Sequence, residues 1–333
     1  MARAGAPSGI ANRRLAQRPP LARAAGSQSA FAQVLERRLQ ILSDLIGKVL
    51  RGRDPEAIHD MRVASRRLQE ALAVAAGAAG EAVPPVIRQL KRLRRALGRV
   101  RDLDVQLVLL REISRELPPG ERPRARVLRQ LLGTRRGRRL RQMRGKLGKV
   151  DLPQLIAALQ GEVERLSRIR PLSLERNLQN HIRARRRELA RASVRARSTW
   201  DEADLHGARI CAKRLRYALE LGDALHPGSQ SGAIKSLKKL QNLLGEWHDL
   251  VVLDGALMRS VGKPAMLRDR LEVVRTVLDL IALVREGKRG KVEAFCASAA
   301  TASRGSARRA MGPPSPPEQP VRAAPGRPPQ AAH

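Results

Sequence analysis

The chain has 333 residues and a formal net charge of +35, because 66 Lys and Arg residues stand against only 31 Asp and Glu. A charge of this size implies a polyanionic partner or an anionic surface and argues against a cationic substrate. The hydrophobic fraction of 42% is too high for a wholly disordered basic protein, so a folded core is expected. Arginine outnumbers lysine by 55 to 11, which favours forked recognition of phosphate, although a GC-rich genome gives the same bias.

The two ends of the chain differ in composition from the rest. Residues 1–28 carry five arginines and no acid, and residues 300–333 contain eight prolines and almost no large apolar residue, so both are expected to be disordered tails. The tails hold +5 and +4 charges, which leaves +26 on residues 29–299. Cys211 and Cys296 show neither a disulfide framework nor metal-ligand spacing, which favours a reducing, cytoplasmic location. No apolar run approaches the roughly 18 residues that a membrane span needs.

Between the tails, apolar residues recur at intervals of three and four, which predicts an all-α fold. The first helix is expected from Phe31. Asp54 followed by Pro55 supplies an N-cap and a first-turn proline for a second helix, and Pro84-Pro85 opens a third. Further helices are expected at 122–145, 151–167, 171–197, 201–225, 231–261 and 265–287.

Three short motifs repeat at the same offset of 147 residues. Residues 58–68 resemble 205–215, residues 90–93 resemble 237–240, and residues 97–103 resemble 244–250. Three matches in one register indicate an internal duplication. We therefore predict two tandem, related helical bundles of the four-helix type, at about 29–145 and 151–295, related by a pseudo-twofold axis.

The repeated residues place cations on one face of a helix in each half. At about 100° per residue, one stripe holds His59, Arg62 and Arg66, and the other holds His206, Arg209 and Lys213, extended by Arg216. Like charges at this spacing cost a few tenths of a kcal/mol per pair, whereas a charge-assisted hydrogen bond to phosphate contributes about 1.5–3 kcal/mol. The stripes therefore predict binding of a phosphate chain, and the alternative is a solvated basic face.

The next helix of each half carries a second set of repeated residues. Lys91, Gly98 and Asp102 share one face, as do Lys238, Gly245 and Asp249. The two aspartates are expected to pair with the stripe arginines and to fix their orientation, and the two glycines to permit close helix approach. The histidines of the stripes are expected to act as titratable phosphate donors, so that binding strengthens from pH 8 to 6. The six histidines are too scattered for the usual metal spacing, and no metal site is expected.

At these residues the chain resembles the CHAD domain family. The matching motifs are His59-x-x-Arg62-x-x-x-Arg66-Arg67-Leu68, Arg101-Asp102-Leu103-Asp104-Val105, His206-x-x-Arg209-x-x-x-Lys213-Arg214-Leu215-Arg216-Tyr217 and Leu240-Gln241-x-x-Leu244-Gly245-x-x-x-Asp249. The resemblance covers about residues 29–295 and implies two four-helix bundles with a basic surface that binds inorganic polyphosphate. Members of the family are associated with polyphosphate granules. The binding residues that the resemblance implies are His59, Arg62, Arg66, Arg67, Lys91, His206, Arg209, Lys213, Arg214, Arg216 and Lys238.

Two features depart from the paired motifs. Position 248 is His where its counterpart in the first half is Arg101, so the halves are expected to differ in affinity or pH response. The arginine-rich stretch 135–141 lies outside the motifs, and it either enlarges the anion-binding surface or is a solvated linker.

The function expected from the sequence is non-enzymatic binding of inorganic polyphosphate without a cofactor, with targeting to polyphosphate granules or their organisation. No nucleophile with a base and no glycine-rich phosphate loop is visible in the sequence. The alternative is a structured-RNA or other nucleic-acid-binding protein. The charge suits it, but aromatics for base stacking make up only 2% of the chain. A membrane binder would need an exposed apolar helix face, and the repeat assigns those faces to the cores.

Overall fold

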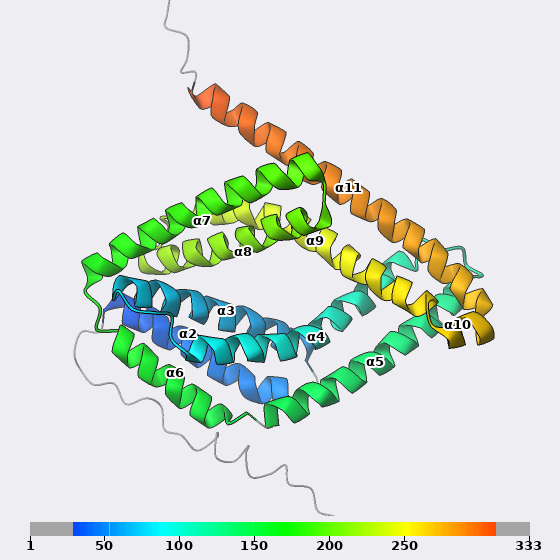
Figure 1. Cartoon of the computed structure of the whole chain (residues 1–333), viewed down its shortest axis with the longest axis horizontal. Coiled ribbons are helices and arrows are strands. Elements are labelled where there is room, and N and C mark those ends of the chain that lie inside the picture. Colours follow the sequence, from blue (N-terminus) through cyan, green and yellow to red (C-terminus); the bar gives the residue numbers. More distant parts are fainter. Residues whose placement is uncertain (1–28, 53, 149, 311–333) are drawn as a thin grey trace, which may run out of the picture. The chain divides into compact units, whose positions relative to one another are not determined.

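The computed structural model describes residues 29–52, 54–148 and 150–310, and within them all regular secondary structure is α-helical (Figure 1). The predicted all-α fold is confirmed. In this part of the chain, no helix combines the length and apolarity that a membrane span needs. The helices are α2 (Ala30–Arg51), α3 (Pro55–Ala78), α4 (Val86–Ile113), α5 (Arg122–Gly148), α6 (Leu152–Leu166), α7 (Pro171–Thr199), α8 (Glu202–Leu225), α9 (Ser231–Val261), α10 (Pro264–Asp269) and α11 (Leu271–Ala310).

Capping residues stand at the N-termini of several helices, as predicted at Asp54. The carboxylate of Asp54 accepts a hydrogen bond of 2.8 Å from the backbone N–H of Glu56, and Pro55 occupies the first turn of α3. Asp151 caps α6 and Asp201 caps α8 in the same way. The helix expected at 265–287 differs, because the chain breaks at Arg270 between the short α10 and the long α11.

The C-terminal part of α11 corrects one expectation. This helix continues to Ala310, so residues 300–310, which we expected to be disordered, are helical. They are mainly Ala, Ser, Thr and Arg, and the first proline after them is Pro313, so nothing in them interrupts a helix as proline does. The rest of the two predicted tails, 1–28 and 311–333, lies outside the described residues. The compact unit that contains the other helices ends at Phe295, and residues from Cys296 on belong to a second unit.

The helix bounds follow the internal repeat. Helix α8 begins and ends 147 residues after α3. Helices α2, α4 and α5 correspond in the same way, within a few residues at most ends, to α7, α9 and the first part of α11. Helices α6 and α10 have no counterpart in the described chain. The duplication thus extends from the short motifs to the whole order of helices.

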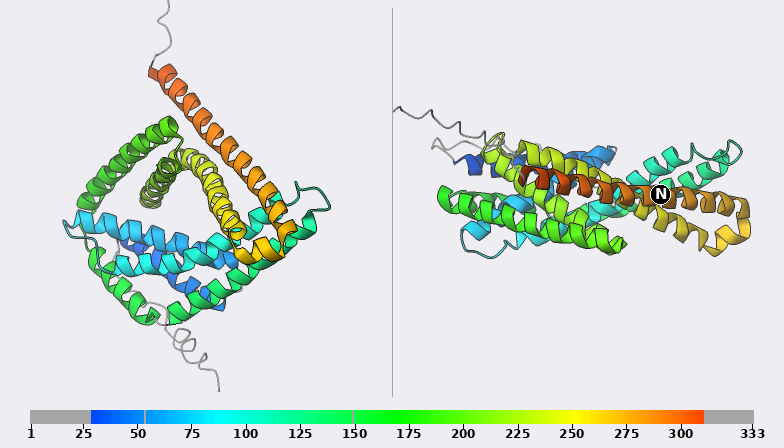
Figure 2. Two further views of the ribbon diagram at one scale, coloured as in Figure 1. Left: turned by 45° about the vertical axis from the view of Figure 1, so that its right-hand side comes forward. Right: turned by 90° about the horizontal axis from the view of Figure 1, so that it is seen from above.

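The hydrophobic cores do not follow the predicted division of the chain at residues 145–151. One cluster joins mainly α2, α3, α6, α7 and α8 with the first half of α4. The other joins the second half of α4 and the first half of α5 with α9, α10 and α11 (Figure 2). Each core therefore draws on both repeats, and the prediction of separate bundles at 29–145 and 151–295 is wrong in this respect. Helix α4 has 28 residues, which is long enough for its two halves to enter different cores.

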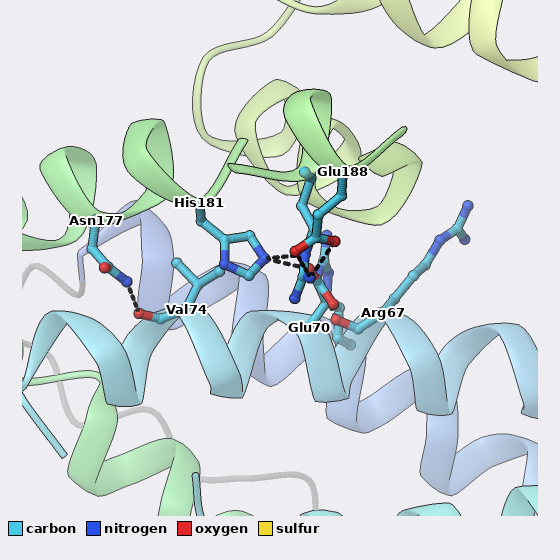
Figure 3. Close-up of polar contacts among 8 residues, drawn as sticks. Arg67, Glu70, Val74, Asn177, His181 and Glu188 are labelled. Carbon is cyan, nitrogen blue, oxygen red and sulfur yellow. Dashed lines mark hydrogen bonds and ion pairs between the residues drawn. The ribbon is translucent and has the colours of Figure 1, made fainter. Parts of the chain in front are cut away.

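Polar contacts fix α7 on α3 within the first core (Figure 3). The side-chain amide of Asn177 donates to the backbone oxygen of Val74 at 2.6 Å, and His181 Nε2 lies 2.6 Å from Glu70 Oε1. A Cβ atom on Gly77 would lie 2.9 Å from the amide nitrogen of Asn177, so a larger residue there would displace it. These contacts bring the repeat-related pairs α2–α3 and α7–α8 into one core.

Candidate functional site

A groove of about 470 Å³ lies between the two repeats. Helices α3 and α4 of the first repeat and α8 and α9 of the second supply its lining. Six basic side chains outnumber three acidic ones there. The basic residues are Arg62, Arg66, Arg101, Arg209, Lys213 and Arg216, and the acidic ones are Asp102, Glu246 and Asp249.

The groove brings together the main parts of the two predicted stripes. His59, Arg62 and Arg66 reach it from α3, and Arg209, Lys213 and Arg216 reach it from α8. Asp102 and Asp249 line it from the neighbouring helices α4 and α9. The helical periodicity therefore identified residues that share a surface, and the fold turns the two stripes toward one space.

Five predicted binding residues do not line the groove: Arg67, Lys91, His206, Arg214 and Lys238. Arg67 and Arg214 each follow a groove cation by one residue, so each is turned about 100° away. The Nε atom of Arg67 instead contacts Glu220 Oε2 at 2.8 Å. Lys91 and Lys238 precede the groove aspartates by 11 residues, which is about 16 Å along a helix. A shared helix face does not imply a shared site over that distance.

The histidines have a different arrangement from the expected one. Nδ1 of His206 lies 3.4 Å from Nδ1 of His248, and it is His248 and His59 that line the groove. Burial and nearby cations lower the pKa of His59 and of His206, and burial with Arg209 lowers the pKa of His248 to about 3. Without a ligand these imidazoles are neutral near pH 7. In the described chain no three His, Cys, Asp or Glu side chains are placed to hold a metal ion.

Arg101, Gln241 and His248 line the groove but were not among the predicted binding residues. Arg101 and Gln241 lie inside the family motifs, so the motifs held the signal that could have identified them. Nη1 of Arg101 is 3.0 Å from Glu56 Oε1. Its counterpart His248 is neutral, so the groove has a cation on the first repeat where the second has none.

In the first repeat, the guanidinium of Arg62 forms a hydrogen bond with a backbone group of a neighbouring helix. Its Nη1 atom donates to the backbone oxygen of Arg94 at 3.0 Å. This nitrogen lies so close to Gly98 that a Cβ atom there would collide with it. Gly98 was expected to permit close helix approach, and what it admits is the end of this arginine.

In the second repeat, the corresponding arginine has no such bond. Arg209 Nε is buried and has no hydrogen-bond partner among the described residues. Gly245 lines the groove, and a Cβ atom there would meet nothing within 4 Å, so the expected close approach at this glycine is wrong. Gln241 stands where the first repeat has Arg94, and its amide donates to the backbone oxygen of Ala212 at 2.6 Å. The groove lining supplied by the second repeat therefore contains a buried donor without a partner, and it leaves open space at Gly245.

The aspartates do not hold the stripe arginines directly. In the described chain, no carboxylate lies within 4.0 Å of the cationic nitrogens of Arg62, Arg66, Arg209 or Lys213, whereas Arg101 and Arg216 do have carboxylate partners. The expected pairing of Asp102 and Asp249 is therefore wrong, and Arg62 uses a backbone oxygen instead. Burial raises the pKa of both carboxyls, and nearby cations oppose that shift.

Burial, with a further contribution from neighbouring cations, lowers the pKa values of several basic side chains in the groove. Burial, followed by the charge of Arg209, lowers the pKa of Lys213 to about 7. Burial, followed by the charge of Arg66, lowers the pKa of Arg62, and burial lowers that of Arg209. An anion in the groove would oppose these shifts, because it favours the charged form of each side chain.

The arginine-rich stretch 135–141 is part of α5 and does not line the groove. Arg136 pairs with the buried Asp104 of α4. Arg135 lies near Arg259 of α9, and burial and this charge lower its pKa. The stretch is therefore part of a helix and not a linker.

The family model and a solved structure that resemble this chain both point to one family. The family model for the CHAD domain matches residues 14–258. Among solved structures, the CHAD domain from the plant Ricinus communis is 23% identical, with a TM-score of 0.63 over 84% of this chain and 97% of that one. PptA from Streptomyces chartreusis is 18% identical, with a TM-score of 0.60 over 81% of this chain and 98% of that one. No curated protein sequence matches. The two structures support the fold, and the family match, which covers most of the sequence, shows that the chain belongs to the CHAD domain family.

Proposed function

We propose that the groove binds inorganic polyphosphate without catalysing a reaction, and that the protein targets or organises polyphosphate granules. The observation that carries this proposal is the buried, unpartnered Nε of Arg209, a residue that lines the groove. Buried donors in proteins almost always have a partner, so a ligand acceptor is the natural one here. Arg66 and Lys213 line the same groove without a carboxylate partner among the described residues.

The charge of the groove suits a chain of phosphates better than a single carboxylate. Its lining has six cations and three acids, contributed from both repeats, so several cations are available to successive phosphates. A charge-assisted hydrogen bond contributes about 1.5–3 kcal/mol, so three such bonds contribute about 4.5–9 kcal/mol, and the upper end of this range corresponds to micromolar affinity. Affinity is expected to fall steeply with salt, since binding releases counterions from the polyanion.

The groove also favours a phosphate chain over a nucleic acid. Tyr217, the one aromatic residue in its lining apart from histidine, is only 5% exposed, and the guanidinium of Arg216 lies 5.2 Å from its ring centre. Neither face of this ring is free to stack on a base. Single-stranded nucleic acids usually gain affinity by such stacking, and polyphosphate does not need it.

A competition experiment tests the proposal. Labelled RNA and long-chain polyphosphate, matched in phosphate concentration, compete for the protein at about physiological salt, with fluorescence anisotropy as the readout. We expect polyphosphate to displace RNA. Arg209→Gln should weaken polyphosphate binding at least tenfold, whereas Arg214→Gln, which removes an exposed cation of the same helix outside the groove, should change it less than about twofold. Preferential RNA binding, or equal effects of the two substitutions, would contradict the proposal.

A further inference from the structure

A second basic surface follows the outward face of α7. The side chains of Arg176, Arg183, Arg187 and Arg191 are exposed and lie within about 80° of one another around the helix axis. We call these four residues the α7 stripe. It extends from residue 176 to residue 191, a rise of 15 steps or about 22 Å along the helix. The buried residues of α7 lie on the opposite side of the helix: Leu174, Leu178, Ile182, Ala192 and Ala196.

The arginines of the α7 stripe are not neutralised within the described chain. None of them forms an ion pair there, and Arg183 donates only to neutral oxygens, at Asn180 Oδ1 (2.8 Å) and the Gln179 backbone (3.4 Å). The two acids of α7 are engaged elsewhere: Glu175 contacts His226, and Glu188 accepts two hydrogen bonds from Arg185. Like charges four residues apart destabilise a helix by a few tenths of a kcal/mol per pair, a cost that a bound polyanion would reverse.

The α7 stripe is separate from the groove. No residue of α7 lines the groove. Helix α7 packs on α3 and α8 through its apolar face, and the contacts of Asn177 and His181 hold it there (Figure 3). Figure 1 shows α7 running along α8. Since α8 supplies Arg209 and Lys213 to the groove from another of its sides, the two basic surfaces are distinct.

We propose that the α7 stripe is a second polyphosphate-binding surface, which lets one protein molecule hold two polyphosphate chains at once. This inference rests on the proposed function of the groove. Arginines spaced four residues, or about 6 Å, along a straight helix suit a linear anion of high charge density. A protein with two such surfaces bridges chains, and each bridge raises the local concentration of chains for the next. Bridging is the physical step by which a binding protein organises a granule.

Energy transfer between labelled chains tests the bridging. The full-length protein is mixed with two pools of polyphosphate, one end-labelled with a donor and the other with an acceptor fluorophore. We expect the wild type to produce energy transfer, and the triple variant Arg183→Gln, Arg187→Gln, Arg191→Gln to lose most of it. Groove affinity, measured by anisotropy at limiting polyphosphate, should change less than about threefold in that variant. A matched control removes three exposed arginines from α4 and α5 instead: Arg111→Gln, Arg126→Gln, Arg129→Gln.

The outcomes separate this inference from the proposed function. If polyphosphate does not bind at all, both fail. Binding without energy transfer in the wild type overturns the bridging alone. So does undiminished transfer in the α7 variant, or an equal loss in the control variant, which would point to total charge rather than to this surface. If the α7 stripe bound an RNA oligomer but not polyphosphate, this result would also overturn the inference.

Discussion

The two repeats place the same arginine in different chemical situations. Arg62 of the first repeat donates to the backbone oxygen of Arg94 and fits over Gly98. Arg209 of the second repeat keeps a buried Nε without a partner among the described residues, and a Cβ atom at Gly245, the counterpart of Gly98, would meet nothing within 4 Å. A motif match therefore preserves the position of a side chain without preserving its role. The first repeat uses its arginine to join two helices, and we propose that the arginine of the second repeat binds the ligand.

The largest expected effect is a charge reversal in the second repeat. Arg209→Glu should weaken polyphosphate binding by about 100-fold or more, since it removes charge-assisted bonds and adds repulsion. Helicity by circular dichroism should be unchanged. Anisotropy with labelled polyphosphate measures the affinity, and Arg214→Glu on the same helix is the control with an equal change of charge. An affinity within threefold of the wild type would mean that Arg209 does not bind the ligand.

The pH dependence of binding should depend on Lys213. Its pKa of about 7 means that it is largely neutral above pH 8 in the free protein, and a bound anion favours the charged form. Binding then takes up a proton, so affinity should fall by up to about tenfold per pH unit from pH 7 to 9 and level off below 7. Lys213→Arg should flatten this profile, because arginine stays charged. Any further rise in affinity below pH 6.5 in that variant would belong to the histidines, and a wild-type profile flat from 7 to 9 would contradict the role of Lys213.

Arg62 should contribute more than Arg209 to the free energy of unfolding, whereas Arg209 should contribute more to polyphosphate binding. Arg62→Ala removes the bond to the Arg94 backbone and should lower the free energy of unfolding by about 1–2 kcal/mol. Arg209→Ala removes a buried donor without a partner, and should leave this free energy unchanged or raise it. Urea denaturation measures both variants. Equal destabilisation by the two substitutions would show that the repeats are energetically alike.

The smallest expected effect concerns the two glycines. Gly245→Ala should raise the free energy of unfolding by about 0.5–1 kcal/mol, because alanine is the better helix former and meets open space. Gly98→Ala should lack this gain, since its methyl group displaces the guanidinium of Arg62. Thermal denaturation of the two variants beside the wild type checks the difference. A gain at position 98 as large as that at 245 would rule out the close fit of Arg62.

The sequence predicted the helices and all but one of the basic residues of the groove, for a clear physical reason. Helical periodicity is local, so it shows that Arg62 shares a face with Arg66 and that Arg209 shares one with Lys213. It does not show how far a site extends along an axis, and Lys91 was included for that reason. The partner of Arg62 is a backbone oxygen of another helix, and the space beside Gly245 depends on how α8 and α9 pack. These properties arise from tertiary packing, and one sequence does not reveal them.

The most direct test of the central claim is a crystal structure of the protein with bound polyphosphate. We expect phosphate density in the groove, with a phosphate oxygen within hydrogen-bonding distance of Arg209 Nε, about 2.7–3.2 Å, and others near Arg66 and Lys213. We also expect Arg62 to keep its bond to the Arg94 backbone in the complex. Polyphosphate bound only elsewhere on the surface, with Arg209 Nε still without a partner, would contradict the central claim.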